Sequence, residues 1–209
     1  MRKIQFTSFT AVICASLGFL LQSTANAQAY KVKASEPKFE GIESPAFGAT
    51  AVRKSFDAKE WLEIEASFEV EMAPEPPSKT ADQILVKWYV AVEHPDVRGG
   101  YLLLTKDVTH VNVPLSEEIF SSVYLSPSSV RRITGSDRAG KRTITFVGFE
   151  VLINGQKVAE EAFGSKAGWW NIPSQKLSRS EIVPLLNKNE TPFAHMWWDR
   201  YAEILPERR

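Results

Sequence analysis

The chain has very little cysteine: among 209 residues there is one, Cys14, in an apolar stretch near the N-terminus. A disulfide within one chain needs two cysteines. The protein must therefore be stabilised by an ordinary hydrophobic core. A chain of this length buries roughly 70% of its unfolded surface, which is enough without covalent crosslinks.

An excess of charge is also missing. The 25 basic residues balance the 25 acidic ones. A nearly neutral chain gives no electrostatic reason to expect nucleic acid or an anionic membrane as partner. The sequence therefore predicts neither partner.

Signatures of catalysis and of metal binding are absent as well. The three histidines, His94, His110 and His195, lack the H-x-H or H-E-x-x-H spacing of zinc sites. There is no G-x-S-x-G nucleophile elbow and no phosphate-binding G-x-x-x-x-G-K-[ST] loop. A hydrolase with carboxylates on separate strands leaves no sequence signature, so it stays an alternative. We predict no catalytic residue, no metal site and no cofactor.

Long hydrophobic runs are limited to one N-terminal segment. Arg2 and Lys3 precede an apolar stretch over residues 9–21, and "QSTANAQA" follows it. This order is typical of a secretory signal peptide, cut after Ala27 or alternatively after Ala29. About 13 apolar positions are too few for a spanning helix, which needs roughly 20. We therefore expect an extracytoplasmic protein, periplasmic or at the cell surface, with no membrane insertion after cleavage.

Two other leader types fit less well. A lipoprotein is cut before a cysteine that follows a small residue, whereas Cys14 follows an isoleucine. A type IV prepilin cut after Gly18 would have Ser23, not glutamate, at its fifth position, so the chain is not a pilin of the usual type. Without residues 1–27 the chain keeps 182 residues, with 23 basic and 25 acidic. This length predicts one domain over residues 28–209.

Two-residue periodicity is what the chain has in abundance. Residues 62–72, "LEIEASFEVEM", alternate apolar side chains with Glu or Ser, the pattern of a half-buried strand. Residues 83–93, "QILVKWYVAVE", place Trp88 and four aliphatic residues on one face and further apolar residues on the other. This predicts a central strand covered on both sides. The proline-rich link between the two strands is long enough to change sheets.

Further strands are indicated on both sides of this pair. Residues 99–115 read as two short strands around Lys106 and Asp107, and residues 30–42 and 50–56 as shorter ones. Asn154-Gly155 between apolar runs predicts a hairpin, because both positions of a two-residue turn favour positive φ.

Helices are expected to be few and short. Ser126 followed by Pro127 predicts a helix N-terminus. Ser178 and Glu181 have the spacing of a second capping box, although Pro184 would end that helix early.

Together these patterns predict a mainly β protein. Seven to nine strands with one or two short helices favour an immunoglobulin-like antiparallel β-sandwich. Trp88, in the middle of the second long strand, is typical of such cores. The antibody-type cysteine pair is missing, and a closed barrel is the competing fold.

The polar face of residues 62–72 carries a row of carboxylates: Glu63, Glu65, Glu69 and Glu71. Alternate residues of a strand lie about 6.6–6.8 Å apart, so this row alone cannot supply the six to eight oxygens of a calcium site. Cross-strand pairing with lysines and arginines of neighbouring strands explains the row more simply. We interpret it as a solvated sheet face.

Aromatic residues are concentrated in the last third of the chain. The pairs Trp169-Trp170 and Trp197-Trp198 are followed by Tyr201. Neighbours on a strand point to opposite faces, so each pair is expected to have one buried and one exposed indole. Closure of the core, contact with a protein partner and stacking on sugar all remain open. These five residues are the candidate binding residues.

The signal peptide, "ILVKWYVAVE", "INGQ" and "NETPFAHMWWDRYAEI" together resemble a known family. It is a verrucomicrobial (Akkermansia-type) family of immunoglobulin-like extracytoplasmic proteins encoded beside type IV pilus genes. The similarity covers the chain from about Tyr30 to its end. The resemblance implies pilus association with surface exposure, no enzymatic activity and no cofactor.

The function expected from the sequence is therefore an exported, non-enzymatic module that acts by protein binding. The resemblance makes it a type IV pilus-associated accessory or host-contact protein. Its partner would be pilus machinery or a host surface, and a homo-oligomer is a further option. The alternatives are a carbohydrate-binding module that uses the same aromatics and, less favoured, a periplasmic hydrolase.

Overall fold

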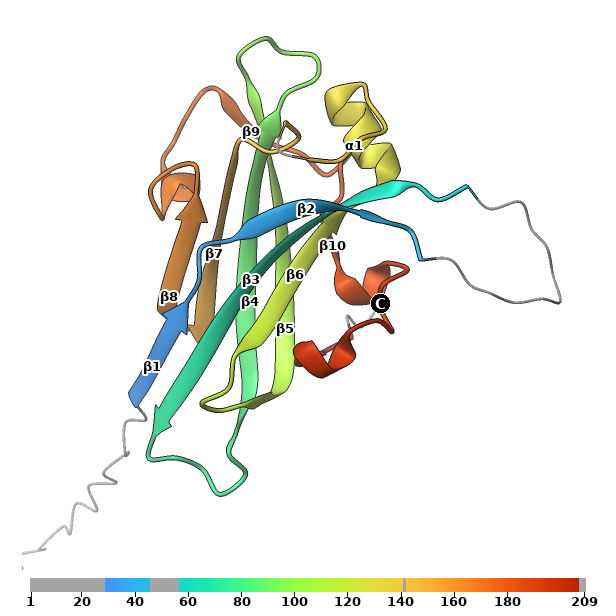
Figure 1. The fold of residues 1–209 in the computed structure, drawn as a ribbon. Coiled ribbons are helices and arrows are strands. Elements are labelled where there is room, and N and C mark those ends of the chain that lie inside the picture. Colours follow the sequence, from blue (N-terminus) through green and yellow to red (C-terminus); the bar gives the residue numbers. More distant parts are fainter. Residues whose placement is uncertain (1–28, 46–56, 141, 207–209) are drawn as a thin grey trace, which may run out of the picture.

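The computed structural model describes residues 29–45, 57–140 and 142–206 (Figure 1). The expected signal peptide, residues 1–27, and the expected strand at 50–56 lie outside the described residues. Within the described ranges, no helix combines the length and the apolar character needed to cross a bilayer.

Eleven strands of the described chain form two sheets. Sheet A has the order β1-β3-β6-β10, and β2 pairs with β3 beyond the end of β1. Its strands are β1 (Ala29–Ala34), β2 (Lys38–Glu43), β3 (Glu60–Ala73), β6 (Ile119–Leu125) and β10 (Leu186–Asn187). Sheet B has the order β11-β5-β4-β7-β8, with β9 paired to β5. Its strands are β4 (Thr80–Glu93), β5 (Tyr101–Pro114), β7 (Phe146–Ile153), β8 (Gln156–Phe163), β9 (Leu177–Arg179) and β11 (Glu203–Ile204).

The strand order confirms the predicted β-sandwich, and the sheets do not close into a barrel. β1, β3 and β6 occupy the positions of strands A, B and E of an immunoglobulin domain. β5, β4, β7 and β8 correspond to C′, C, F and G. Trp88 thus lies on the strand equivalent to C, as in immunoglobulin domains.

The core lies between the two sheets, where the alternation of the long strands places their apolar residues. The inward-facing residues of β3 and β4 are buried: Leu62, Ile64, Ala66, Phe68, Val70, Ile84, Val86, Trp88, Val90 and Val92. The prediction of a central strand covered on both sides is confirmed for β4: it lies between β5 and β7. On its outer face Ala91 is fully buried and Tyr89 stacks on Trp170.

A short polar chain crosses this core. The Trp88 indole N–H donates to Ser121 Oγ at 3.2 Å, and His110 Nε2 lies 3.0 Å from the same oxygen. His110 Nδ1 lies 3.3 Å from the carbonyl oxygen of Ala202. Burial lowers the pKa of His110 to about 4, against a weaker opposing effect of its backbone hydrogen bond to Ala202. The imidazole is therefore neutral in the folded protein near pH 7.

Two local predictions are confirmed. Asn154 and Gly155 have φ of 51° and 76°, as the hairpin between β7 and β8 requires. The helix α1 (Pro127–Thr134) begins after Ser126, whose side chain accepts a hydrogen bond from the Ser129 N–H at 3.2 Å.

Two others are wrong. Residues 101–114 form one strand, β5, because Lys106 and Asp107 keep the alternation and pair with Trp88 and Lys87 of β4. The expected helix after Ser178 does not form, since residues 177–179 pair in parallel with the edge of β5 as β9.

After β8 the chain runs over the outside of the sandwich; we call residues 164–206 the C-terminal segment. It passes over the outer face of sheet B with the 3-10 helix η1 (Trp169–Asn171) and adds β9 to β5. It then adds β10 to β6 and forms η2 (Lys188–Glu190) and η3 (Trp198–Arg200). It returns to sheet B as β11 (Figure 1, orange to red). One segment thus covers both sheets and the edge between β5 and β6.

Candidate functional site

The first tryptophan pair lies on the outer face of sheet B. Trp169 and Trp170 are 8% and 6% exposed, so the expectation of one buried and one exposed indole is wrong here. The reason is local: the pair lies in η1, not in a strand, and the two rings meet edge to face at 5.6 Å. This burial leaves little indole surface for a partner.

The Trp170 ring is packed closely against its neighbours on sheet B. Its ring stacks on Tyr89 with centroids 4.7 Å apart and planes 6° apart. Its N–H donates to Glu150 Oε1 at 3.2 Å. Gly148 lies directly beneath the ring, where a Cβ would overlap it. We call this packed group the sheet B cover.

The C-terminal segment covers the outer face of sheet A in a different way, because that face is polar. Glu63, on β3, is only 8% exposed and accepts a hydrogen bond from the Tyr124 hydroxyl at 2.5 Å. The Ser122 hydroxyl donates to the Tyr124 oxygen at 3.0 Å. Burial raises the pKa of Glu63, the Tyr124 hydrogen bond opposes this, and the nearby carboxylates of Glu65 and Glu40 add to the increase.

Glu65, the next carboxylate along β3, binds the C-terminal segment directly. It accepts hydrogen bonds from the Tyr201 hydroxyl and from Arg200 Nη2, the latter at 2.8 Å. The Arg200 guanidinium also lies 3.8 Å above the centre of the Phe120 ring. Burial and the carboxylate of Glu65 raise the pKa of Tyr201. These contacts fix η3 on the sheet.

A lysine is buried beneath the same segment. Lys188, at the start of η2, is 3% exposed, and its ammonium donates to the carbonyl oxygen of Met196. The ammonium lies 4.7 Å from the centre of the Tyr201 ring. Burial lowers the pKa of Lys188, while the Glu63 carboxylate opposes that change. A buried cation and a buried carboxylate thus share this interface.

The second tryptophan pair lies at the outer end of an aromatic stack. Phe193 stacks on Tyr124 at 5.5 Å and on Trp197 at 6.2 Å, while Trp61 meets it edge-on at 5.8 Å. Trp197 is 49% exposed. Trp198 begins η3, but its side chain lies outside the described part of the structure. Residues 187–202, together with Glu63, Glu65 and Tyr124, are called the sheet A cover below.

Trp197 also has an unusual backbone. Its φ is 51°, in the left-handed region that a bulky residue adopts only at a cost. Such conformations persist when the surrounding structure enforces them. The chain therefore holds an aromatic ring half in solvent at an energetic cost, which makes Trp197 the candidate contact residue.

The carboxylates of the acidic row lie in two different environments. Glu71 pairs with Lys31 of β1 at 3.0 Å and is exposed, as predicted. For Glu63 and Glu65 the solvated interpretation is wrong, because the C-terminal segment lies over them. Their alternation with apolar residues shows that they face away from the core, but not that other residues cover them. No sequence signal marked Lys188 as buried.

The sheet A cover does not have the arrangement of a hydrolytic site. The hydroxyls of Tyr124 and Tyr201 donate to carboxylates. The Thr191 hydroxyl and the Lys188 ammonium donate to backbone carbonyls. In the ranges that the structure describes, no three His, Cys, Asp or Glu side chains group as metal ligands. The arrangement suits rigid presentation of Trp197.

The fold and this C-terminal segment place the chain in the class of immunoglobulin-like β-sandwiches with a wrapped C-terminal extension. A protein-family model matches residues 23–208, nearly the whole chain. A crystal structure of a protein from Akkermansia muciniphila is 37% identical and superposes with a TM-score of 0.83. The match covers 87% of this chain and 96% of that one. The chain belongs to the matched family and is of the Akkermansia type. No curated protein sequence matches it.

Proposed function

We propose that the chain is an exported, non-enzymatic module that binds another protein, as a type IV pilus-associated accessory or host-contact protein. The observation that carries the binding role is Trp197, a half-exposed indole that is held on a stack of buried rings by a left-handed backbone. Exposed tryptophans are frequent energetic centres of protein interfaces. The pilus association is supported by the resemblance of the sequence and by its Akkermansia-type family.

Rigidity is what suits this surface to binding. A side chain that is already ordered loses less conformational freedom on association than a mobile one. Phe193, the Glu65–Arg200 ion pair and the buried Lys188 fix both sides of Trp197. A partner with an apolar hollow and polar rim would bury the indole with little reorganisation.

The test is site-specific crosslinking in the native cells. A photo-crosslinking amino acid in place of Trp197 is expected to capture a pilus component, identified by mass spectrometry. The matched control carries the same group at Ile182, an exposed apolar residue of the C-terminal segment at 69% exposure. Capture of the same proteins at both positions, or of no pilus component at Trp197, would contradict the proposal.

Selective sugar binding would favour the alternative function, a carbohydrate-binding module. On a glycan array, selective binding by the wild type that is lost in Trp197→Ala would assign the indole to carbohydrate stacking. The proposal of a protein partner expects no selective glycan signal.

A further inference from the structure

A cavity of about 500 Å³ lies beside α1 and the loop that follows it. Arg138 and Arg142 line it, together with the hydroxyl-bearing residues Ser136 and Thr143 and the carboxylate of Glu93. It shares no lining residue with the sheet A cover. Two arginines line it, whereas each of the other hollows described around the sandwich has a single lysine or arginine.

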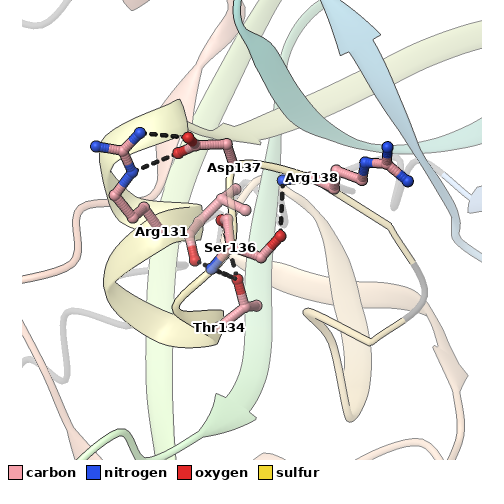
Figure 2. Close-up of polar contacts among 6 residues, drawn as sticks. Arg131, Thr134, Ser136, Asp137 and Arg138 are labelled. Atoms are coloured by element: carbon pink, nitrogen blue, oxygen red, sulfur yellow. Dashed lines mark hydrogen bonds and ion pairs between the residues drawn. The ribbon is translucent and has the colours of Figure 1, made fainter.

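The loop that forms this cavity is ordered by its own hydrogen bonds (Figure 2). Gly135 ends α1 with φ of 69°, and the Ser136 N–H donates to Thr134 Oγ1 at 3.1 Å. The Arg138 N–H donates to Ser136 Oγ at 3.2 Å. The Ala139 N–H donates to Glu60 Oε2 at 2.8 Å, which anchors the loop to β3. Arg138 therefore extends from a backbone that hydrogen bonds hold on both sides of it.

The acidic residue of the loop is paired with an arginine outside the cavity, whereas the two arginines that line the cavity have no ion pair within the part of the chain that the structure describes. Asp137 binds both Nε and Nη2 of Arg131, so its carboxylate is already paired (Figure 2). Figure 2 shows the guanidinium of Arg138 on the other side of the loop, directed away from Asp137. Over the described ranges, neither Arg138 nor Arg142 takes part in an ion pair. Glu93 is the single carboxylate among the residues that line the cavity, which leaves a net positive charge.

We propose that this cavity binds a sulfate or phosphate group. A guanidinium presents up to five N–H donors in a planar fork that matches such oxyanions. The Ser136 oxygen accepts from a backbone N–H, so its own hydrogen remains free to donate. Two forks and a hydroxyl around one hollow suit an anion with three or four oxygens better than a planar carboxylate. The group could be free in solution or carried on a saccharide.

The test is calorimetric titration of the intact mature protein with inorganic sulfate and with inorganic phosphate at constant ionic strength. Saturable binding is expected, and the double variant Arg138→Gln/Arg142→Gln should weaken it roughly tenfold or more, because hydrogen bonds to charged groups contribute most. The control Arg132→Gln removes an exposed α1 arginine that does not line the cavity, and should bind like the wild type.

A second titration, with a sulfated and a phosphorylated monosaccharide, distinguishes a free anion from one that is esterified to a sugar. Tighter binding of a sugar ester than of the free ion, lost in the double variant, assigns the cavity to the esterified group; equal affinity assigns it to the free ion. Thermal unfolding without ligand checks that the variants fold, and Arg138→Gln alone replaces the double variant if it does not. Unsaturable titration of the wild type, or wild-type affinity in the variants at Arg138 and Arg142, would overturn the proposal.

Discussion

The two outer faces of the sandwich are covered by one continuous segment, yet the two covers differ in chemistry. On sheet B, Trp169 and Trp170 pack against Ala91, Leu103 and each other with both indoles buried. On sheet A, the segment lies over two glutamates and a tyrosine and leaves Trp197 half exposed. The first cover resembles a small second core, and the second a polar interface with an aromatic projection.

The difference originates in the sheets and not in the tryptophan pairs. The outer face of sheet B offers small and apolar groups such as Gly148 and Leu103, on which the Trp170 ring packs with a single hydrogen bond, to Glu150. The outer face of sheet A offers Glu63 and Glu65, and buried polar groups require hydrogen-bonding partners. Tyr201 and Arg200 provide them for Glu65. The same dipeptide therefore has both rings buried on one sheet and leaves the Trp197 ring half exposed on the other.

The largest effect on stability is expected at Trp170. Trp170→Ala should lower the free energy of unfolding by about 3–5 kcal/mol, because it empties a packed site. The measurement is urea denaturation of the protein without residues 1–27. Ile172→Ala, at a neighbouring residue that is 66% exposed, is the control and should change stability little. A loss at Trp170 no larger than at Ile172 would show that the sheet B cover is not structural.

The next effect concerns pH and the core between the two covers. The folded pKa of His110 is about 4, below the unfolded value near 6.5, so the unfolded chain binds the extra proton between these values. The contribution of the neutral His110 imidazole to the free energy of unfolding is complete above pH 6.5. It is lost as the pH falls toward 4, and the loss is about 3 kcal/mol at most. His110→Asn should flatten the dependence of urea midpoints on pH in this window. An unchanged slope would place the acid sensitivity elsewhere.

A smaller effect of opposite sign is expected at Glu63. The pKa of Glu63 is raised in the folded protein. The stability that its protonated carboxyl contributes is therefore present below the ordinary glutamate pKa and is lost as the pH rises through the folded pKa. Glu63→Gln keeps an acceptor for the Tyr124 hydroxyl but cannot ionise. Relative to the wild type, this variant should gain stability as the pH rises from 4 to 8. Glu71→Gln, at the exposed end of the same row, is the control and should show no such gain.

The smallest effect on stability is expected at Trp197. Trp197→Gly removes the ring stacked on Phe193, worth about 0.5–1.5 kcal/mol, and relieves a left-handed backbone of similar cost. The two terms should nearly cancel in the urea midpoint, whereas a binding role predicts loss of partner association. Strong destabilisation would make the sheet A cover as structural as the sheet B cover.

The long strands could be predicted from the sequence because their periodicity is a local property. The alternation of residues 62–72 and 83–93 follows directly from which side chains face the core. The Asn154-Gly155 turn and the Ser126 cap depend on neighbouring residues alone. These features located Trp88 in the core and gave the sandwich.

The covers could not be predicted because their contacts join distant parts of the chain. The Glu65–Arg200 pair links residues far apart in sequence, and no local pattern at either one identifies its partner. β10 and β11 have two residues each, too few to show a period. The tryptophan pairs were noticed, but their burial depends on which sheet face lies beneath them.

The wrapped segment also has a consequence for how the molecule matures. In the described chain, β5 has β4 on one side, and β9 and β11 pair with the two ends of its other edge. β10 likewise pairs with part of the outer edge of β6. A chain synthesised from its N-terminus has β1 to β8 before it has the residues that pair with those edges. Until the last residues arrive, two rows of backbone donors and acceptors are open to neighbouring molecules. By pairing with both edges, the C-terminal segment reduces the open backbone through which copies of the chain could associate edge to edge.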